Sequence, residues 1–364
     1  MRASTTTALT HISKVKRSMT KDALPLGKLP LPLLQKFLRD LPVSDPQVIV
    51  GPGIGLDAAV LKFGKETLIF KTDPITFATE DIAWYLVTIN ANDIACMGGI
   101  PRYLLVTCLL PQGTTTPETA SAIFSGLIKA CTSHGITLVG GHTEITYGID
   151  RPIAIGFMVG TLSDYGLVQS SGAKPGDAIL LSKSIPIEAT SLLAREVPER
   201  LALDKNTISR AQRLIYEPGI SVVRDARIAL ESGGVTAMHD PTEGGLSTGL
   251  LELASASGCG IEVHMERIPI LDLASKILPI FSIDPMGALA SGSLLVCCSP
   301  ESAPQILKAW EQASIGGAII GRITSGSDLI LYREGKPHPF PLFTTDEITK
   351  VFSNKRASGV RLKV

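Results

Sequence analysis

The chain has 364 residues, with 34 Lys and Arg against 34 Asp and Glu, so its formal net charge is zero. This balance argues against a general nucleic-acid-binding protein, which would carry excess positive charge. The six cysteines form no Cys-x-x-Cys pair, so neither a disulfide scaffold nor a cysteine zinc site is expected. No run of 18 apolar residues occurs, so we expect no membrane span and a cytoplasmic protein.

The first part of the chain is basic. Residues 1–21 hold five Lys or Arg and no acid, which predicts a flexible basic N-terminus over residues 1–24 and leaves open whether it is a targeting segment. A helix is predicted from Leu31 to Leu41. After it comes a glycine loop, Gly51-Pro-Gly-Ile-Gly-Leu-Asp57.

A first α/β domain is predicted over residues 25–168. Apolar runs punctuated by glycine and proline give its expected strands as 58–63, 67–72, 103–110, 136–139 and 153–159. Helices are expected over 80–97 and from Pro117 to the glycine at 135. We expect a turn at Gly140-Gly141, followed by His142-Thr143-Glu144.

A second domain is predicted over residues 169–345, because the turn-rich segment Ser170–Asp177 precedes a new apolar strand. Helices then alternate with strands, and residues 346–364 are expected to form a tail. The adjacent Cys297 and Cys298 lie in an apolar run and are interpreted as a buried strand. The fold class is therefore mixed α/β (α+β) in two domains.

Acids that neighbour turns indicate the chemistry. Asp57 closes the glycine loop, Asp73 ends an apolar strand, Asp93 lies in an otherwise apolar helix, and Asp240 precedes Pro-Thr-Glu-Gly-Gly. Such carboxylates can bind magnesium, and glycine loops let backbone N–H groups approach a phosphate. Asp beside a turn is also a common turn former, so each acid alone is weak.

Several other sites are not supported. The glycine loop lacks the third glycine of a Rossmann fingerprint, and no Gly-Lys-Ser/Thr phosphate loop or Gly-x-Ser-x-Gly elbow occurs. His142 and His239 stand beside acids, and each is interpreted first as a hydrogen-bonded structural histidine rather than a metal ligand.

Six segments in order resemble the aminoimidazole ribonucleotide (AIR) synthetase superfamily, the PurM-like group. That group includes thiamine-monophosphate kinase, selenophosphate synthetase and the hydrogenase maturation protein HypE. The segments are Gly53–Leu61, Lys71-Thr-Asp73, Asn92–Arg102, Gly140-Gly-His-Thr143, Lys174-Pro-Gly-Asp177 and Asp240–Leu246. The second-domain segment Asp240–Leu246 and the helix end Asn92–Arg102 look closest to HypE-like members.

The resemblance implies a PurM-like two-domain fold, whose N-terminal sheet pairs with that of a second subunit to form a barrel in a homodimer. It further implies ATP and Mg²⁺ as cofactors and a small-molecule substrate. Catalytic roles would fall to Asp57, Asp93 and Asp240, and metal binding to Asp57, Asp73, Asp93, Asp240 and Glu144. The nucleotide would be bound by Gly53, Gly55, Asp57, Asp73, Asn92, Gly140, Gly141, His142 and Thr143. Clustered carboxylates repel by about 4 kcal/mol per pair at 4 Å and an effective dielectric of 20, which favours a bound cation.

This sequence departs from the superfamily in three places. His142 stands where several members have Asp, so Glu144 either replaces that carboxylate or the contact is gone. HypE acts through a cysteine at its C-terminus, whereas this sequence ends at Val364 and its last cysteine is Cys298. The first cysteine is Cys96, so the reactive N-terminal residue of selenophosphate synthetase has no counterpart.

Two classes of function follow from these observations. The first is a magnesium-dependent enzyme that uses an ATP phosphate to activate a small molecule, without the HypE thiol step. The second is a non-catalytic nucleotide-binding assembly or regulatory subunit, and HypE itself, with Cys297 or Cys298 as the thiol, is a third interpretation. The acceptor is not defined: specificity is expected in loops 74–81, 147–151 and 283–293, and roles for Glu188 and Thr190 stay open.

Overall fold

The first sheet contains the five predicted N-terminal strands and a short strand, β1, that was not predicted. A computed structural model describes residues 24–39 and 41–352; the expected flexible segment 1–23 and residues 353–364 lie outside the described residues. The strands pair in the order β1-β2-β3-β6-β4-β5, and only β4 and β5 run parallel. Their bounds are β1 Val48–Val50, β2 Ala59–Phe63, β3 Glu66–Ile75, β4 Gly99–Pro111, β5 Thr137–Thr146 and β6 Ile153–Leu162.

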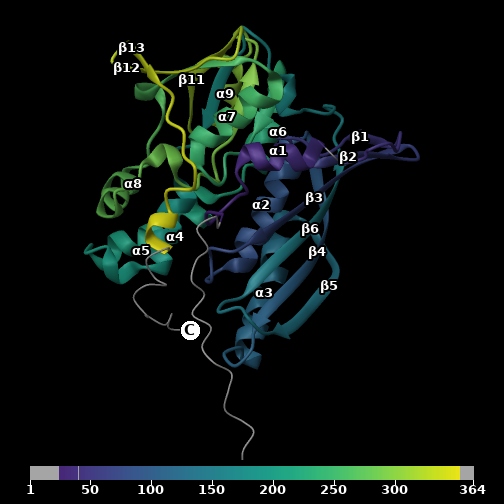
Figure 1. Cartoon of the computed structure of the whole chain (residues 1–364), viewed down its shortest axis with the longest axis vertical. Coiled ribbons are helices and arrows are strands. Elements are labelled where there is room, and N and C mark those ends of the chain that lie inside the picture. Colours follow the sequence, from purple (N-terminus) through teal and green to yellow (C-terminus); the bar gives the residue numbers. More distant parts are fainter. Residues whose placement is uncertain (1–23, 40, 353–364) are drawn as a thin grey trace, which may run out of the picture.

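Helices α2 (Ile82–Cys96) and α3 (Pro117–His134) lie on one side of this sheet (Figure 1). Every residue of α2 except Trp84 is buried, because the helix lies between the sheet and the second domain. This placement explains its apolar sequence, and it makes Asp93 a buried acid. The helix α3 begins and ends as the sequence predicts: Thr116 caps its first turn, and Gly135 follows its last with φ of 65°.

The second sheet has seven strands in the order β13-β12-β9-β11-β7-β10-β8. Side chains of β7 alternate between its two faces: Ile179 and Leu181 pack under α7, whereas Ala178 and Leu180 pack under α6 and α9. The strands are β7 Ala178–Ser182, β8 Val235–His239, β9 Gly260–His264, β10 Leu295–Cys298, β11 Gly317–Thr324, β12 Leu329–Arg333 and β13 Lys336–Pro339. The covering helices are α6 Val223–Ser232, α7 Gly245–Ser257 and α9 Ala303–Gln312.

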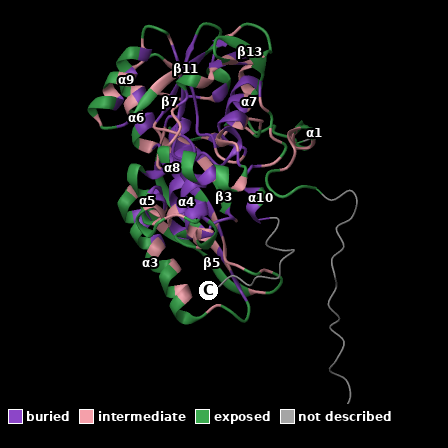
Figure 2. Cartoon of the chain, turned by 90° about the vertical axis from the view of Figure 1, so that its left-hand side faces the viewer, coloured by how far each residue is buried: buried purple, intermediate pink, exposed green. Residues whose placement is uncertain are grey.

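A third group of helices continues the core of the first domain. It comprises α4 Ile187–Glu196, α5 Lys205–Arg213, α8 Asp272–Ile277 and the short α10 Thr349–Phe352. Residues 346–352, expected to belong to the tail, are mostly buried (Figure 2). Asp346 accepts hydrogen bonds from the backbone N–H groups of Gly244 and Ile348, so any tail begins only after α10. The remaining helix, α1 Leu31–Arg39, confirms the predicted N-terminal helix.

The expected turn at Gly140-Gly141 is wrong. Strand β5 runs straight through both glycines to Thr146. Glycine is needed there because a Cβ at Gly141 would lie 1.9 Å from the carbonyl oxygen of Val106 on β4. Gly141 therefore permits close strand pairing, and the chain does not reverse here.

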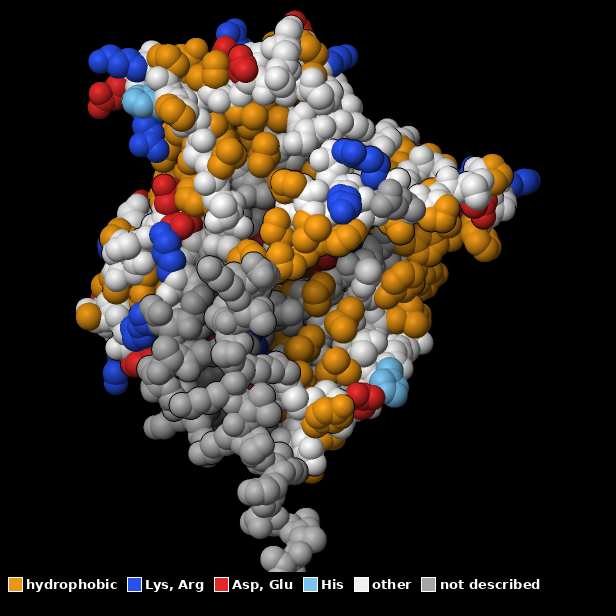
Figure 3. Space-filling view, viewed as in Figure 1, with side chains coloured by type: hydrophobic (Ala, Val, Ile, Leu, Met, Phe, Trp, Pro, Cys, Tyr) orange, Lys and Arg blue, Asp and Glu red, His pale blue; other side chains and the backbone are white. Residues whose placement is uncertain are grey.

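The first sheet of a single chain is open, so no closed barrel is present within it. Its outer face carries exposed apolar side chains, and orange patches cover this flank in Figure 3. They are Tyr103, Leu105 and Phe157, each between 38% and 48% exposed. Within the described residues, no helix combines the length and apolar character that a membrane crossing requires.

Candidate active site at the domain seam

Asp57, Asp73, Asp93 and Asp240 meet where the two domains join. Asp57 follows the glycine loop after β1, and Asp73 lies within β3 rather than at its end. Asp93 is on the last turns of α2, and Asp240 directly follows β8. The fold thus brings together four acids that lie far apart in the sequence.

Asp93 and Asp240 are almost fully buried, at 3% and 2% exposure. One oxygen of each, Oδ2, makes no hydrogen bond with the described residues. The second oxygen of Asp93 lies 3.2 Å from Lys71 Nζ, and that of Asp240 accepts from the Cys96 thiol at 3.4 Å. Burial raises the pKa of Asp93 and of Asp240, and neighbouring carboxylates add to the effect.

Lys71 is the cation nearest to these acids. Its Nζ also lies 3.3 Å from Asp73, so one ammonium group bridges two carboxylates. Burial would lower the pKa of Lys71, but Asp93 and Asp73 raise it above its usual value. Lys71 is therefore a permanent positive charge within the cluster.

His239 links the first domain to α7. Its Nδ1 lies 2.8 Å from Asp57, and its Nε2 lies 2.9 Å from Glu252. Burial would lower the pKa of His239, but the two carboxylates raise it well above its usual range. Both ring nitrogens therefore have a carboxylate partner, as expected for a hydrogen-bonded histidine.

Three charged residues of the site, Lys28, Glu243 and Glu252, were not predicted from the sequence. Lys28 donates its backbone N–H to Glu243 at 2.8 Å, and its Nζ lies 3.6 Å from Glu252. Burial opposes ionisation of Glu252, but Lys28 and His239 hold its pKa down at about 2. The motif Asp240-Pro-Thr-Glu243 could have indicated Glu243, because its second acid lies three residues after Asp240. Lys28 had no signal, since only the fold brings it to α7.

The glycine loop approaches α7 closely. Gly55 has φ of 68°, and a Cβ there would lie 2.6 Å from the carbonyl oxygen of Glu252. Only glycine fits this conformation and this contact. Gly53 lies in the same half-exposed loop, so the loop positions Asp57 and leaves backbone groups accessible beside it.

Asn92, which was predicted to bind the nucleotide, instead bonds to the backbone of the second domain. Its side-chain amide donates to the carbonyl of Ile220 at 2.9 Å and accepts from the N–H of Val222 at 2.8 Å. The residue is fully buried, so it ties α2 to the second domain and faces no ligand. Its neighbour Asn90 instead accepts from the backbone N–H of Asp73 at 3.1 Å and orients that acid.

The predicted residues on β5 do not join the acids within one chain. His142 and Glu144 are exposed and lie 3.3 Å from each other. Strand β5 is the edge of the sheet, three strands from β3, or about 14 Å at the usual spacing. Gly140, Gly141 and Thr143 share this edge. A contact with a nucleotide bound at the acids would need a second subunit.

The acid cluster fits a hard divalent cation. Six carboxylates (Asp57, Asp73, Asp93, Asp240, Glu243 and Glu252) face three cations (Lys28, Lys71 and His239), so negative charge is in excess. The unbonded Oδ2 atoms of Asp93 and Asp240 are ligands of the kind that Mg²⁺ prefers. Asp57, Asp73, Asp93 and Asp240 are the residues that would hold it.

Family comparison agrees with this geometry. The N-terminal domain of AIR synthase related proteins matches residues 55–162, and the C-terminal domain of the same family matches residues 174–334. The chain belongs to the AIR synthase related family. The superfamily expected from the six segments is thereby confirmed.

Named relatives of the chain are enzymes or maturation factors. A putative hydrogenase expression/formation protein of Methanocaldococcus jannaschii is 27% identical, over 80% of this chain and 88% of its own. The carbamoyl dehydratase HypE of Escherichia coli is 27% identical over 74% and 79%. The thiamine-monophosphate kinase of Pyrococcus horikoshii is 28% identical over 79% and 89%. With this ancestry and its acid cluster, the chain is an enzyme.

Solved structures share the fold. The crystal structure of E. coli HypE superposes with a TM-score of 0.69 at 21% identity, covering 88% of this chain and 98% of the other. A HypE structure in complex with ATP superposes with a TM-score of 0.66 at 21% identity, covering 86% and 91%. At this identity the likeness establishes the mixed α/β fold alone.

Cys297 and Cys298 cannot act as an accessible thiol. Both are fully buried in strand β10, between β7 and β8, which confirms the predicted buried strand. Burial raises the pKa of each thiol, so neither is a thiolate at neutral pH. The interpretation of this chain as HypE with one of these cysteines as carrier is therefore not supported.

Proposed function

We propose that this chain is a magnesium-dependent, ATP-binding enzyme that uses an ATP phosphate to activate a small-molecule substrate. One observation carries the proposal: the carboxylate oxygens Asp93 Oδ2 and Asp240 Oδ2 are buried together and lack partners. A buried carboxylate without a partner is costly, and a cation shared with phosphates would remove that cost. Asp57 and Asp73 complete the acidic set around them.

Magnesium, when bound, would neutralise phosphate charge and the charge that develops on a leaving oxygen. The chain's own groups would bind the phosphates and position the acids. Lys71 offers a fixed ammonium beside Asp73 and Asp93, and the half-exposed glycine loop at Gly53 and Gly55 offers backbone N–H groups. His239 holds Asp57 in place through its hydrogen bond to that carboxylate.

We further propose that the enzyme is a homodimer formed through the outer face of the first sheet. The exposed apolar residues on β4 and β6, such as Tyr103 and Phe157, support this interface. A partner sheet packed there would cover the β5 edge. His142 and Glu144 of one subunit would then be available to a nucleotide held by the acids of the other.

The alternative is a non-catalytic nucleotide-binding assembly or regulatory subunit. The sequence feature that favours it is His142, which stands where several superfamily members have Asp. A third possibility, synthesis of a hydrogenase ligand, takes its support from the relatives' names alone, and its thiol is not found among the described cysteines. The buried acid cluster favours the enzyme, since a scaffold has no use for desolvated carboxylates.

The test is ATP binding and hydrolysis by the purified full chain, with magnesium and with EDTA, against a panel of small metabolites. We expect magnesium-dependent binding and a turnover that one class of metabolite stimulates. Magnesium-dependent binding with no turnover on any metabolite would select the regulatory alternative. No binding in either condition would overturn both.

A further inference from the structure

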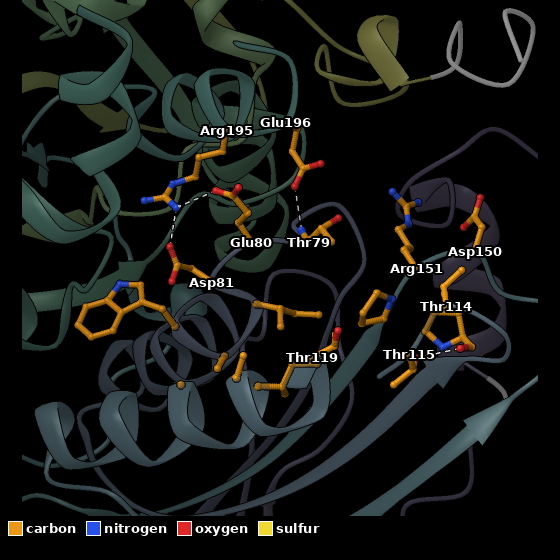
Figure 4. A pocket seen from close by; sticks show the side chains of 18 of the residues that line it. Thr79, Glu80, Asp81, Thr114, Thr115, Thr119, Asp150, Arg151, Arg195 and Glu196 are labelled. Carbon is orange, nitrogen blue, oxygen red and sulfur yellow. Dashed lines mark hydrogen bonds and ion pairs between the residues drawn. The ribbon is translucent and has the colours of Figure 1, made fainter. Parts of the chain in front are cut away.

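A cavity lies at the end of α2 that is opposite to the acid cluster. It has a volume of about 810 Å³ and is lined by both domains (Figure 4). The first domain contributes the β3–α2 loop, α3 and the β5–β6 loop, and the second contributes the end of α4. Asp93 lies ten residues along α2 from the lining residue Ala83, or about 15 Å. The cavity is therefore separate from the candidate phosphate site.

The floor of the cavity is apolar. It is formed where α2 and α3 cross, with Ala83, Trp84 and Ile123 among the lining residues. Gly126 lets the helices approach, since a Cβ there would lie 3.1 Å from that of Ala83. A floor of this kind suits the apolar body of a small organic ligand, and the volume falls in the range of known small-molecule sites.

One wall of the cavity is already neutralised. Arg195 of α4 donates to Asp81 at 2.5 Å, lies 3.5 Å from Glu80, and donates to the carbonyl of Gln212 at 2.9 Å. Figure 4 shows Arg195, Glu80 and Asp81 together, on the opposite side of the view from Arg151 and Asp150. Because Arg195 has its carboxylate partners, it ties the two domains together and is not available to a ligand.

The other wall holds a cation without a carboxylate. Arg151 is half-buried, and within residues 24–39 and 41–352 no acid forms an ion pair with it. Among the other lining acids, Asp150 and Glu199 are exposed at the rim, where water screens their charge, and half-buried Glu196 accepts a hydrogen bond from the Thr79 N–H at 2.9 Å. Thr79 also lines the cavity, and its buried hydroxyl has no hydrogen-bond partner among the described residues.

We infer that this cavity binds a small organic anion, a carboxylate or phosphate ester with an apolar body, and that Arg151 anchors its charged end. The planar guanidinium matches both kinds of anion with paired hydrogen bonds. Thr79 offers a further donor, and the floor between α2 and α3 takes the body. The loops 74–81 and 147–151, where the sequence placed specificity, both contribute to this site.

The test uses phenylpropionate, phenyl phosphate and the neutral phenylpropionamide as probes, with binding to the full chain followed by ligand-observed NMR. We expect at least one anion to bind, and to bind about tenfold or more tightly than the amide. Which anion binds distinguishes a carboxylate from a phosphate ligand. Equal binding of the amide, or no binding of either anion at millimolar concentration, would overturn the inference.

Substitutions in the cavity test whether the probes bind there. Arg151→Gln should weaken the anion about tenfold, and Ala122→Trp, an exposed helix position that lines the cavity, should block it. Arg322→Gln, on the second sheet, is the matched control and should change nothing. Binding unaffected by Arg151→Gln would contradict the inference.

The inference is independent of the proposed function. Asp93→Asn should abolish magnesium-dependent ATP turnover and leave probe binding intact. Loss of probe binding in that variant would mean that the probes occupy the acid cluster, and it would also overturn the second site.

Discussion

Lys71 Nζ lies 3.2 Å from Asp93 Oδ1, a contact that joins strand β3 to helix α2 within the first domain. The side chain of Lys71 is 17% exposed and that of Asp93 is 5% exposed, so the pair lies mostly out of water. The same ammonium reaches Asp73 at 3.3 Å. One ammonium group therefore offsets the repulsion between two carboxylates. Replacing Lys71 by an uncharged residue should make the stability of the protein depend more strongly on a bound cation.

Lys71→Met should destabilise the protein by about 3 kcal/mol without magnesium, because a buried carboxylate loses its partner. Magnesium should restore more of the melting temperature in this variant than in the wild type, since it would screen the same acids. Differential scanning fluorimetry with magnesium or EDTA measures this. Lys183→Met is the matched control, because its buried pair with Asp225 at 2.9 Å lies outside the cluster and should not respond to magnesium. An identical magnesium response in both variants would contradict the proposed metal site.

Asp93→Asn should lower ATP turnover at least about a hundredfold, because the amide keeps the shape and loses the charge that a cation needs. Circular dichroism should show an unchanged fold. Asp204→Asn, at the exposed cap of α5, is the control and should turn over ATP at the wild-type rate. Wild-type turnover by Asp93→Asn would remove Asp93 from the catalytic set.

Asn92→Ala should lower the free energy of unfolding by about 2 to 3 kcal/mol. The change leaves the Ile220 carbonyl and the Val222 N–H buried without a partner. Urea unfolding gives the stability, and equilibrium binding gives the ATP affinity of the folded variant. We expect that affinity to stay within a factor of about two of the wild type. A stable variant with weakened ATP binding would instead restore the nucleotide-binding role.

Glu188 should make stability depend on pH. Burial raises the pKa of Glu188 to about 7, and the nearby carboxylates of Asp346 and Glu243 contribute. The folded state then holds a proton that the unfolded chain, titrating near 4.5, has released. This contribution favours folding below about pH 4.5 and is lost as the pH rises through 7.

Glu188→Gln removes that titration. The variant should be more stable than the wild type at pH 8, by an amount on the order of 2 kcal/mol, with a difference that shrinks toward pH 5. Thermal melts across this range measure the difference, and Glu311→Gln, at an exposed position on α9, should show none. A difference that does not vary with pH would mean that Glu188 is ionised in the fold throughout.

Tyr103→Glu should abolish the proposed homodimer. Tyr103 is 48% exposed at the outer face of β4. In the proposed dimer, a charge there would be buried against the first sheet of the partner subunit. Light scattering coupled to size exclusion should change from a dimer to a monomer, and ATP turnover should fall with it. Leu342→Glu, an exposed apolar position in the second domain, should remain dimeric. A monomeric wild type would refute the interface outright.

Much of the local structure could be predicted from the chain itself. Thr116 and Gly135 fixed both ends of α3 because capping is a local interaction, and the apolar run over β10 indicated a buried strand. Prediction failed at Gly140-Gly141, which looked like a turn and is strand. The reason is non-local: glycine is required at position 141 by the Val106 carbonyl on a neighbouring strand.

The sequence by itself determined which acids are present, their order and the family to which the chain belongs, since these depend on residue identity and spacing. Only the tertiary structure decided which side chains share one site. It brought Lys28 and Glu252 to His239, assigned Asn92 to the domain seam, and placed Arg151 across the cavity from Arg195. Distances between residues remote in the chain depend on how the two domains pack, and no local pattern encodes that packing.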